Sequence, residues 1–301
     1  MTLITPVPYV LNSTNVPVQI VDPEYNLSST YNTGDRVYYP PMHTIYKATQ
    51  NVPANHPPVR YPEYWEIVEV VNAYKMFDQY LNTQTVHNGI IEIDISGGDA
   101  GELDLLIDSI YLGNLYATSV SITAFDGNDN QLDQVTYNLM GEDCNDWLDY
   151  FSMSWVSKTK TDVLYISNSV VPPMRYHITI TPINDTAKVG ITLIGHKFTY
   201  GAVQYDAKTR VIDYSNVTTN EAGYTQLEKG YSTTLVDIDV VLPTRLANQL
   251  KETLKKNRGL PILLTVGDVE LLRVYGILED NEIILSSPVW STSNIIVKGL
   301  I

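Results

Sequence analysis

The chain has 301 residues, of which 44 % are hydrophobic, and a formal net charge of −15 at pH 7. That length is sufficient for two or three domains with separate cores. The negative charge argues against nucleic acid and anionic membranes as partners, because both require clustered Lys and Arg. The single cysteine, Cys144, excludes an intrachain disulfide, so stability must come from packing or assembly.

Two further features concern targeting and contact surfaces. The first residues, MTLITPVPYVLNS, lack a basic segment followed by an apolar one, so we expect no secretory signal. No apolar run reaches the roughly 18 residues of a membrane span, so we expect no membrane insertion. Tyr is over-used, with 22 residues against 4 Phe. Such rings suit half-buried contact surfaces, because the ring is apolar and the hydroxyl remains hydrated.

Residues 1–30 are predicted to form an extended N-terminal arm. Pro6, Pro8, Pro17 and Pro23 disfavour a helix throughout this segment. Two interpretations remain open from the residues alone. The arm is either an ordinary loose terminus or a segment that lies across a neighbouring subunit.

Residues 31–68 are predicted to form a compact aromatic module of two or three short strands. The segment resembles the small chitin- and cellulose-binding modules of the type-5/12 carbohydrate-binding group. The matching residues are Tyr31, Gly34, Asp35, Val37, Tyr39, Tyr46 and Tyr64-Trp65. Pro40-Pro41 departs from that pattern, because the group has Gly in the first hairpin.

The resemblance implies a carbohydrate-binding site at Tyr39, Tyr46, Tyr64 and Trp65. Sugar C–H groups stack on flat aromatic faces, and Tyr64 with Trp65 would form the main platform. The alternative is that Trp65 and Tyr39 fill a very small core, which leaves the module as a structural spacer.

Residues 69–88 are predicted to be a connector with helix-like spacing of Tyr74, Phe77 and Leu81. Residues 89–200 are predicted to form a jelly-roll-like antiparallel β-sandwich of seven or eight short strands. A turn at residues 97–101, a strand over 105–111, a strand with Val120 and Ile122, and a hairpin at 126–130 fit this fold.

The stretch from Val163 to Gly195 is the most regular part of the predicted sandwich. Tyr176, Ile178 and Ile180 alternate with polar residues, as do Val189, Ile191 and Leu193 with Gly190 and Thr192. A period of two with β-branched residues is typical of half-buried strands. Pro172-Pro173 and Asn184-Asp185 are predicted turns between these strands.

Residues 201–301 are predicted to be a C-terminal strand–helix–strand unit. The expected helix runs from Pro243 to Arg258, with Leu246, Leu250 and Leu254 on one face and Gly259 at its end. Further strands are expected at 236–240, 262–266, 271–278, 282–285 and 295–297. Basic residues in the last helical turns fit the helix dipole, or contact an acidic neighbouring subunit.

A second resemblance covers about two-thirds of the chain. The run Asp146-Trp147-Leu148-Asp149-Tyr150-Phe151, together with the strands that follow it, is similar to a recurrent tail-associated protein of tailed bacteriophages. In that group the motif has Tyr where this chain has Leu148. The resemblance implies a homo-oligomeric virion protein of the tail tip, baseplate or fibre-attachment region, assembled in the host cytoplasm. Its implied partners are other tail proteins and host surface polysaccharide.

No catalytic or metal site emerges from the motifs. The histidines at 43, 56, 87, 177 and 196 lack ligand spacing, and Cys144 has acidic neighbours that raise a thiol pKa. Asp126, Asn128 and Asn130 alternate like calcium ligands, but a plain hairpin turn is the simpler interpretation. Acidic pairs such as Asp143 with Asp146 are too common here to indicate a glycosidase.

The residues therefore predict a mainly β fold made of a small aromatic β module, a jelly-roll-like sandwich and a C-terminal α+β unit with one helix. The expected function is structural, as a component of a phage virion, with no enzymatic activity, no cofactor and no metal. A free, lectin-like carbohydrate-binding protein is the alternative, and a glycan-cleaving enzyme is a third hypothesis.

Overall fold

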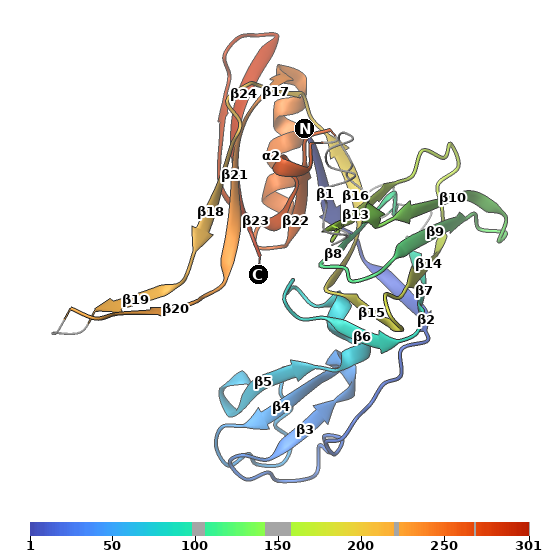
Figure 1. The fold of residues 1–301 in the computed structure, drawn as a ribbon, viewed down its shortest axis with the longest axis vertical. Coiled ribbons are helices and arrows are strands. Elements are labelled where there is room, and N and C mark those ends of the chain that lie inside the picture. The colour runs from blue at the N-terminus through green and yellow to red at the C-terminus, as the bar shows by residue number, and fades with distance from the viewer. Residues whose placement is uncertain (98–105, 142–157, 220–222, 268, 301) are drawn as a thin grey trace, which may run out of the picture.

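The computed structural model describes residues 1–97, 106–141, 158–219, 223–267 and 269–300. The predicted fold class is confirmed, because the chain is mainly β with one α-helix in the described part of its C-terminal unit. Figure 1 shows the aromatic module at the bottom of the view, the sandwich at the right and the C-terminal unit at the upper left. The Asp146–Phe151 motif, Cys144 and residues 98–105 lie outside the described residues.

The sandwich consists of a five-stranded antiparallel sheet facing one end of a ten-stranded sheet. The smaller sheet has the order β10-β9-β14-β7-β2. Its strands are β2 (Tyr9–Thr14), β7 (Ile91–Gly97), β9 (Ser119–Phe125), β10 (Gln131–Asn138) and β14 (Arg175–Thr181). The facing strands are β8 (Ser109–Gly113), β13 (Val163–Ile166) and β16 (Ile191–Thr199). Two small pairs, β6 (Thr85–Asn88) with β15 (Thr186–Val189) and β11 (Met140–Gly141) with β12 (Lys158–Thr159), flank them.

The central strand of the smaller sheet, β14, confirms the predicted alternation. Tyr176, Ile178 and Ile180 are fully buried, while the residues between them are partly exposed. Ile178 lies opposite Ile93 of β7 on one side and Ile122 of β9 on the other. These side chains form one face of the sandwich core, which explains why a period of two with β-branched residues encodes this strand.

Strand β16 differs from the half-buried strand predicted for it. Its residues from Ile191 to Gly195 are all buried, and it belongs to the ten-stranded sheet rather than to the sheet of β14. Ile194 packs into the sandwich core, whereas Ile191 and Leu193 pack against Leu263 and neighbouring side chains. Both faces are therefore covered, so the alternation with Gly190 and Thr192 did not mark a solvent-facing side.

The predicted turns at 126–130 and at Asn184-Asp185 are present. Asn184 and Asp185 both have positive φ, of 47° and 67°. Ile183 and Thr186 exchange backbone hydrogen bonds of 3.1 and 3.0 Å across the turn. Positive φ at both central residues defines a type I′ hairpin turn, and Asn and Asp tolerate that conformation better than most residues.

The start of the chain is an integral part of the fold, so the interpretation of this segment as an ordinary loose terminus was wrong. Strand β1 (Thr2–Pro6) pairs with β16 on one side and with β22 (Ile262–Thr265) on the other. It thereby joins the sandwich and the C-terminal unit into one sheet, in which β16, β1 and β22 are consecutive neighbours. Leu3 and Ile4 are fully buried, which explains the apolar start of the chain.

The aromatic module is a three-stranded sheet, as predicted. Its strands are β3 (Arg36–Tyr39), β4 (Thr44–Ala48) and β5 (Trp65–Val70), with the short 3-10 helices η1 (Pro40–Met42) and η2 (Pro62–Tyr64) between them. Pro40-Pro41 starts η1, so the hairpin that departs from the carbohydrate-binding pattern closes through a helical turn. The predicted connector contains a 3-10 helix, η3 (Asn72–Phe77), with Ala73 and Met76 in the sandwich core.

The C-terminal unit contains the predicted helix, α2 (Thr244–Lys256), packed on β21 (Ser232–Pro243), β23 (Val274–Ile284) and β24 (Trp290–Gly299). Ala247, Leu250 and Leu254 are buried, and Gly259 follows the helix with φ of +76°. The two strands expected at 271–278 and 282–285 are one strand, β23, with an irregularity between Leu278 and Asp280. A 3-10 turn, η5 (Glu270–Leu272), precedes it.

A long hairpin leaves this unit and is called the ribbon here, residues 208–231. It comprises β18 (Lys208–Asp213), β19 (Asn216–Thr219) and β20 (Thr225–Glu228), next to the short β17 (Ala202–Val203). Strand β18 pairs with β21, while β19 and β20 pair only with each other in the described residues. Figure 1 shows β19 and β20 projecting away from the rest of the molecule.

Candidate functional site: the aromatic module, its joint and the sandwich-end pocket

The four residues proposed for sugar binding come from three elements of the module. Tyr39 ends β3, Tyr46 lies in β4, and Tyr64 and Trp65 stand where η2 meets β5. The rings of Tyr39 and Tyr46 are perpendicular, with centroids 6.2 Å apart. All four side chains belong to one cluster with Val37, Ala48 and Val52.

Trp65 and Tyr46 are core residues, so the expected exposed platform of Tyr64 and Trp65 does not form. Only 6 % of Trp65 and 7 % of Tyr46 is exposed. Tyr25 and Tyr31 pack edge-to-face against Trp65, with ring centroids 5.9 and 5.4 Å away. An aromatic face covered in this way cannot stack on a sugar.

The Trp65 indole also has a structural hydrogen bond. Its Nε1–H donates to the carbonyl of His56 over 3.0 Å. This bond fixes the loop before η2, since a buried indole N–H needs an acceptor. Burial raises the pKa of Tyr46, as expected for a phenol that fills a core.

Tyr25 is the residue of this cluster that sequence reasoning missed. It was assigned to the N-terminal arm, yet it stacks on Tyr31 at 5.6 Å and packs against Tyr39 at 5.7 Å. Its backbone N–H also donates to the carbonyl of Tyr38. The excess of Tyr over Phe was the available signal, because a core of half-buried rings suits phenols with hydrated hydroxyls.

A second aromatic group lies at the rim of the module. The ring of His56 is 4.3 Å from Tyr61 and 5.2 Å from Tyr64, between centroids. All three residues are partly exposed, unlike Trp65. Tyr39 and Tyr64 are thus the two predicted site residues that keep partial exposure, and both also pack against the Trp65 core. Of the two, Tyr64 contacts the rim group through His56.

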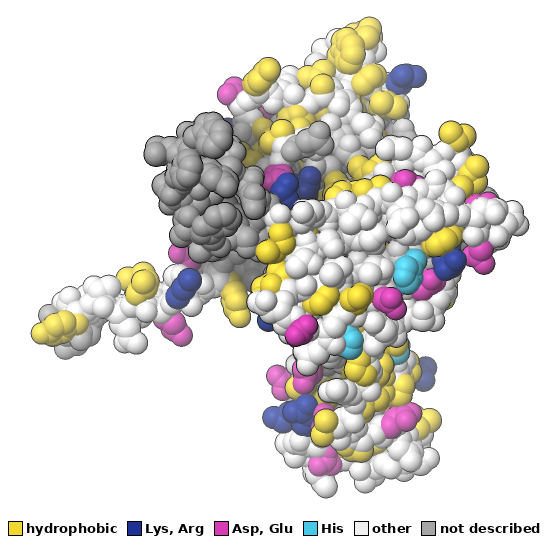
Figure 2. Space-filling view, turned by 45° about the vertical axis from the view of Figure 1, so that its right-hand side comes forward, with side chains coloured by type: hydrophobic (Ala, Val, Ile, Leu, Met, Phe, Trp, Pro, Cys, Tyr) yellow, Lys and Arg dark blue, Asp and Glu magenta, His cyan; other side chains and the backbone are white. Residues whose placement is uncertain are grey.

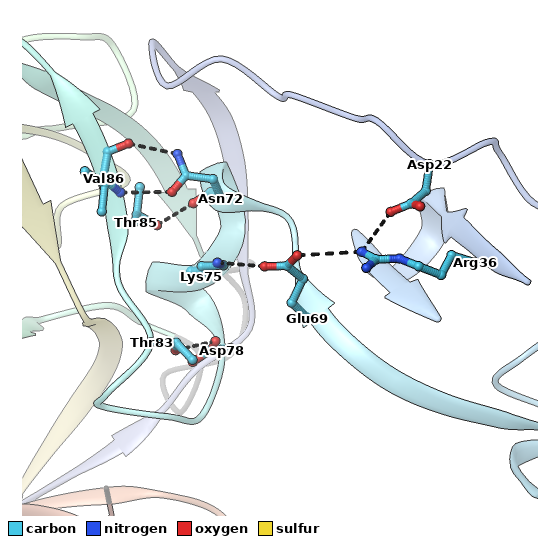
Figure 3. A network of polar contacts seen from close by, with 9 residues as sticks. All are labelled: Asp22, Arg36, Glu69, Asn72, Lys75, Asp78, Thr83, Thr85 and Val86. Atoms are coloured by element: carbon cyan, nitrogen blue, oxygen red, sulfur yellow. Dashed lines mark hydrogen bonds and ion pairs between the residues drawn. The ribbon is translucent and has the colours of Figure 1, made fainter. Parts of the chain in front are cut away.

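The joint between module and sandwich is held by polar contacts that Figure 3 shows together. Glu69 at the end of β5 accepts from Lys75 of η3 over 3.0 Å and lies 3.9 Å from Arg36, which also pairs with Asp22 at 3.0 Å. Asn72 binds the backbone of Val86 in β6 through both side-chain atoms, at 2.8 and 3.0 Å.

Apolar contacts reinforce the same joint. Val71, Tyr38 and Ile45 are buried together, and the ring of Tyr74 stacks on His43 at 3.6 Å with an angle of 6°. Burial lowers the pKa of His43, which favours the neutral form of the stacked imidazole. The connector therefore fixes the module against the sandwich and does not act as a flexible tether.

A pocket of about 550 Å³ opens at one end of the sandwich, between the ends of β2 and β7, the β9–β10 hairpin and the start of β14. Arg175 lies in it, with Nη1 2.7 Å from Asp94 and Nε 3.0 Å from Asp129. Its guanidinium also stacks on Phe125, 4.2 Å from the ring centroid. These partners hold the arginine in place, so we assign it a structural role.

The alternating oxygens at 126–130 form a turn, in agreement with the simpler interpretation. Asp126 accepts hydrogen bonds from the backbone N–H groups of Asn128 and Asn130 and from the Asn130 side chain, at 2.8 to 2.9 Å. These bonds lower the pKa of Asp126, with the Asn130 side chain as the first cause. Within the described ranges, no group of three or more His, Cys, Asp or Glu residues could hold a metal ion.

Comparisons with known proteins add little. No family model and no curated protein matches the chain. Among solved structures, one similar chain is a CBM32 module from a family 31 glycoside hydrolase of Clostridium perfringens, at 15 % identity. It covers 41 % of this chain and 83 % of that module with a TM-score of 0.26, which is too low to support an argument. The resemblance to phage tail proteins has no support here and stays a prediction.

Membrane insertion was not expected from the sequence. Across the part of the chain that the structure describes, no helix combines the length and the hydrophobicity that crossing a bilayer would require.

Proposed function

We propose that the chain is a structural and interaction component of a tailed-phage virion, in the tail tip, baseplate or fibre-attachment region, and that it acts without catalysis. The observation that carries this proposal is that large apolar side chains are exposed on segments that project away from the hydrophobic cores. In the ribbon these are Val211, Tyr214, Val217, Tyr224, Leu227 and Tyr231, each between 47 and 75 % exposed.

An exposed ribbon of this kind favours an assembly role. A two-stranded hairpin is marginally stable alone in water, and a contiguous exposed apolar surface usually marks an interaction site. The rigid joint of the module fits the same role, because a fixed spacer presents its outer rim at a defined angle. Other tail proteins and further copies of this chain are the proposed partners, with assembly in the host cytoplasm.

The proposed role is tested in two steps. Light scattering across a range of concentrations should give masses that are multiples of the 33.8 kDa chain. Antibodies against the recombinant chain should label the tail of particles of the encoding phage. Particles without label, together with release of reducing ends from polysaccharide by the purified chain, would contradict the proposal and favour an enzyme.

A second candidate function is glycan contact by the module, as in a lectin-like protein. The observation that favours it is the rim of His56, Tyr61 and Tyr64, in which the partly exposed rings of Tyr61 and Tyr64 lie 4.3 and 5.2 Å from the ring of His56. Adjacent aromatic rings with hydrated hydroxyls suit the C–H faces of sugars. Trp65 supports the module from beneath, and we assign it no direct contact.

A glycan array with the full chain tests this candidate. Tyr64→Ala should weaken binding about 10-fold, equivalent to about 1.4 kcal/mol, because a stacking face is removed. Tyr205→Ala is the matched control, since that tyrosine is fully exposed and lies outside the module. Equal binding by both variants, or no binding by the original chain, would leave the module as a spacer.

A further inference from the structure

Two exposed apolar surfaces lie at opposite ends of the paired strands β21 and β24. The first is the ribbon. The second is the turn between β23 and β24, called the tip here, residues 284–290. Ile284, Leu285, Val289 and Trp290 of the tip are 51, 70, 63 and 52 % exposed. Figure 2 shows hydrophobic side chains spaced along the projecting ribbon at the left, among polar and charged ones, and others at the top of the molecule.

The register of β21 with β24 places the two surfaces apart. Pro243 pairs with Trp290 at the tip, whereas Leu235 pairs with Lys298 close to the base of the ribbon. Eight residue steps of β-strand separate these positions, which corresponds to about 26 Å. The ribbon and the tip of one copy therefore cannot cover each other.

The absence of charge at the tip and the exposed apolar area of the ribbon favour contact between copies. The tip sequence ILSSPVW has no ionisable side chain, in a chain whose net charge is −15. Two such chains repel each other unless they meet through segments with little charge. Large side chains bury on the order of 100–200 Å² each, so the six exposed apolar residues of the ribbon could supply a substantial part of the roughly 800 Å² that one partner buries in a standard interface.

We propose that the ribbon of one copy docks on the tip of a second copy, head to tail. This inference rests on the proposed structural role, and it names a second copy of the chain as one partner in that role. Pairing of ribbon with ribbon, or of tip with tip, would cover only one of the two surfaces in each copy. Head-to-tail contact covers both in every interior copy, and such heterologous contacts generate rings when the rotation closes and filaments when it does not.

The same contact explains the shape of the ribbon. Val217 of β19 lies directly opposite Leu227 of β20, so the two side chains share one face of the hairpin. Thr218 and Gln226 form the next cross-strand pair and lie on the other face. The apolar face is the one that docks, and docking supplies the packing partner that an isolated hairpin lacks.

Cysteine cross-linking tests this geometry directly. Val217→Cys and Val289→Cys are introduced separately and together in a Cys144→Ser background, which removes the only natural cysteine. The double variant should form a ladder of disulfide-linked species, and a mixture of the two single variants should form dimers. An intrachain bond is excluded, because bridged Cα atoms lie within about 7 Å.

Dimers from Val217→Cys alone would show ribbon-to-ribbon pairing, and dimers from Val289→Cys alone would show tip-to-tip pairing. Either result overturns the inference, as does the absence of any cross-link.

A charge substitution provides the matched solution test. Leu227→Asp should weaken self-association at least 10-fold by light scattering, since it places a carboxylate in the docked face. Gln226→Asp adds the same charge one position away on the opposite face and should leave association unchanged. An oligomer that persists in Leu227→Asp would overturn this inference and leave the proposed structural role intact. Particles whose tails lack the chain would instead overturn that role.

Discussion

Buried tyrosines are the most informative single residues of the chain. The hydroxyl of Tyr176 donates to the carbonyl of Ile107 over 2.7 Å, and that of Tyr165 donates to Asp133 over 3.0 Å. Both side chains are almost fully buried. Burial raises the pKa of Tyr165 and of Tyr9 to about 12, and it raises the pKa of Tyr176 further. The folded protein therefore holds these protons more tightly than the unfolded chain.

This difference predicts alkaline destabilisation. An unfolded tyrosine has a pKa near 10, so below about pH 10 both states keep the proton and stability is complete. Between about pH 10 and pH 12 the unfolded chain binds fewer protons, and the free energy of unfolding falls as pH rises. Urea unfolding from pH 8 to pH 11.5 should show this decline. Tyr205→Phe is the control, because it removes a tyrosine that is fully exposed and lies outside the buried cores. A constant free energy of unfolding up to pH 11.5 would contradict the prediction.

At the scale of the element, helix α2 is held against the sheet by one stripe of buried apolar side chains. Leu250 is fully buried, and its neighbour Lys251 is exposed. Lys255 and Lys256 stand in the last turn, where positive charge complements the helix dipole. The helix is held by its packing against the sheet, since no side chain caps its N-terminus.

Two substitutions distinguish the contribution of buried packing to the stability of this helix from that of intrinsic helix propensity. Leu250→Ala should lower the free energy of unfolding by about 2–5 kcal/mol, because it leaves a cavity under the helix. Lys251→Ala changes the adjacent exposed position and should alter it by no more than about 0.5 kcal/mol. Chemical unfolding followed by tryptophan fluorescence measures both. Similar losses in the two variants would show that the helix does not depend on its buried stripe.

Local patterns made α2, β14 and the Asn184-Asp185 turn predictable, because each is encoded by a period or by turn chemistry within a few residues. The double burial of β16 and the core position of Trp65 were not predictable in this way. Alternation shows which residues share a face but not whether another layer covers that face. An aromatic residue fills a core or an exposed platform equally well, so the site residues required the structure.

For the molecule as a whole, strand β1 is the element that links the sandwich to the C-terminal unit. It lies between β16 of the sandwich and β22 of the C-terminal unit. Gly195 makes the close approach possible, because a Cβ at that position would lie 2.4 Å from the carbonyl oxygen of Thr5. The two units behave as one sheet only while this contact is intact.

Gly195→Ala should therefore weaken the pairing of β1 with β16. A methyl group there pushes β1 from β16, and we expect a loss of about 1–3 kcal/mol together with a broader calorimetric transition. Gly127→Ala is the matched control, since its Cβ would meet only Met174 at an ordinary 3.8 Å. An unchanged, single sharp transition in Gly195→Ala would show that the sheet tolerates separation at β1.

The position of β1 also has a consequence for biosynthesis. Thr2 is synthesised before its pairing residues Thr199 and Thr265, which are made almost 200 and more than 260 positions later. At about 5–20 residues per second, this apolar strand waits on the order of 10–50 s for its second neighbour. Nascent copies that have not reached β22 keep an open sheet edge, so their early release from the ribosome would invite mispairing before any productive encounter between finished chains.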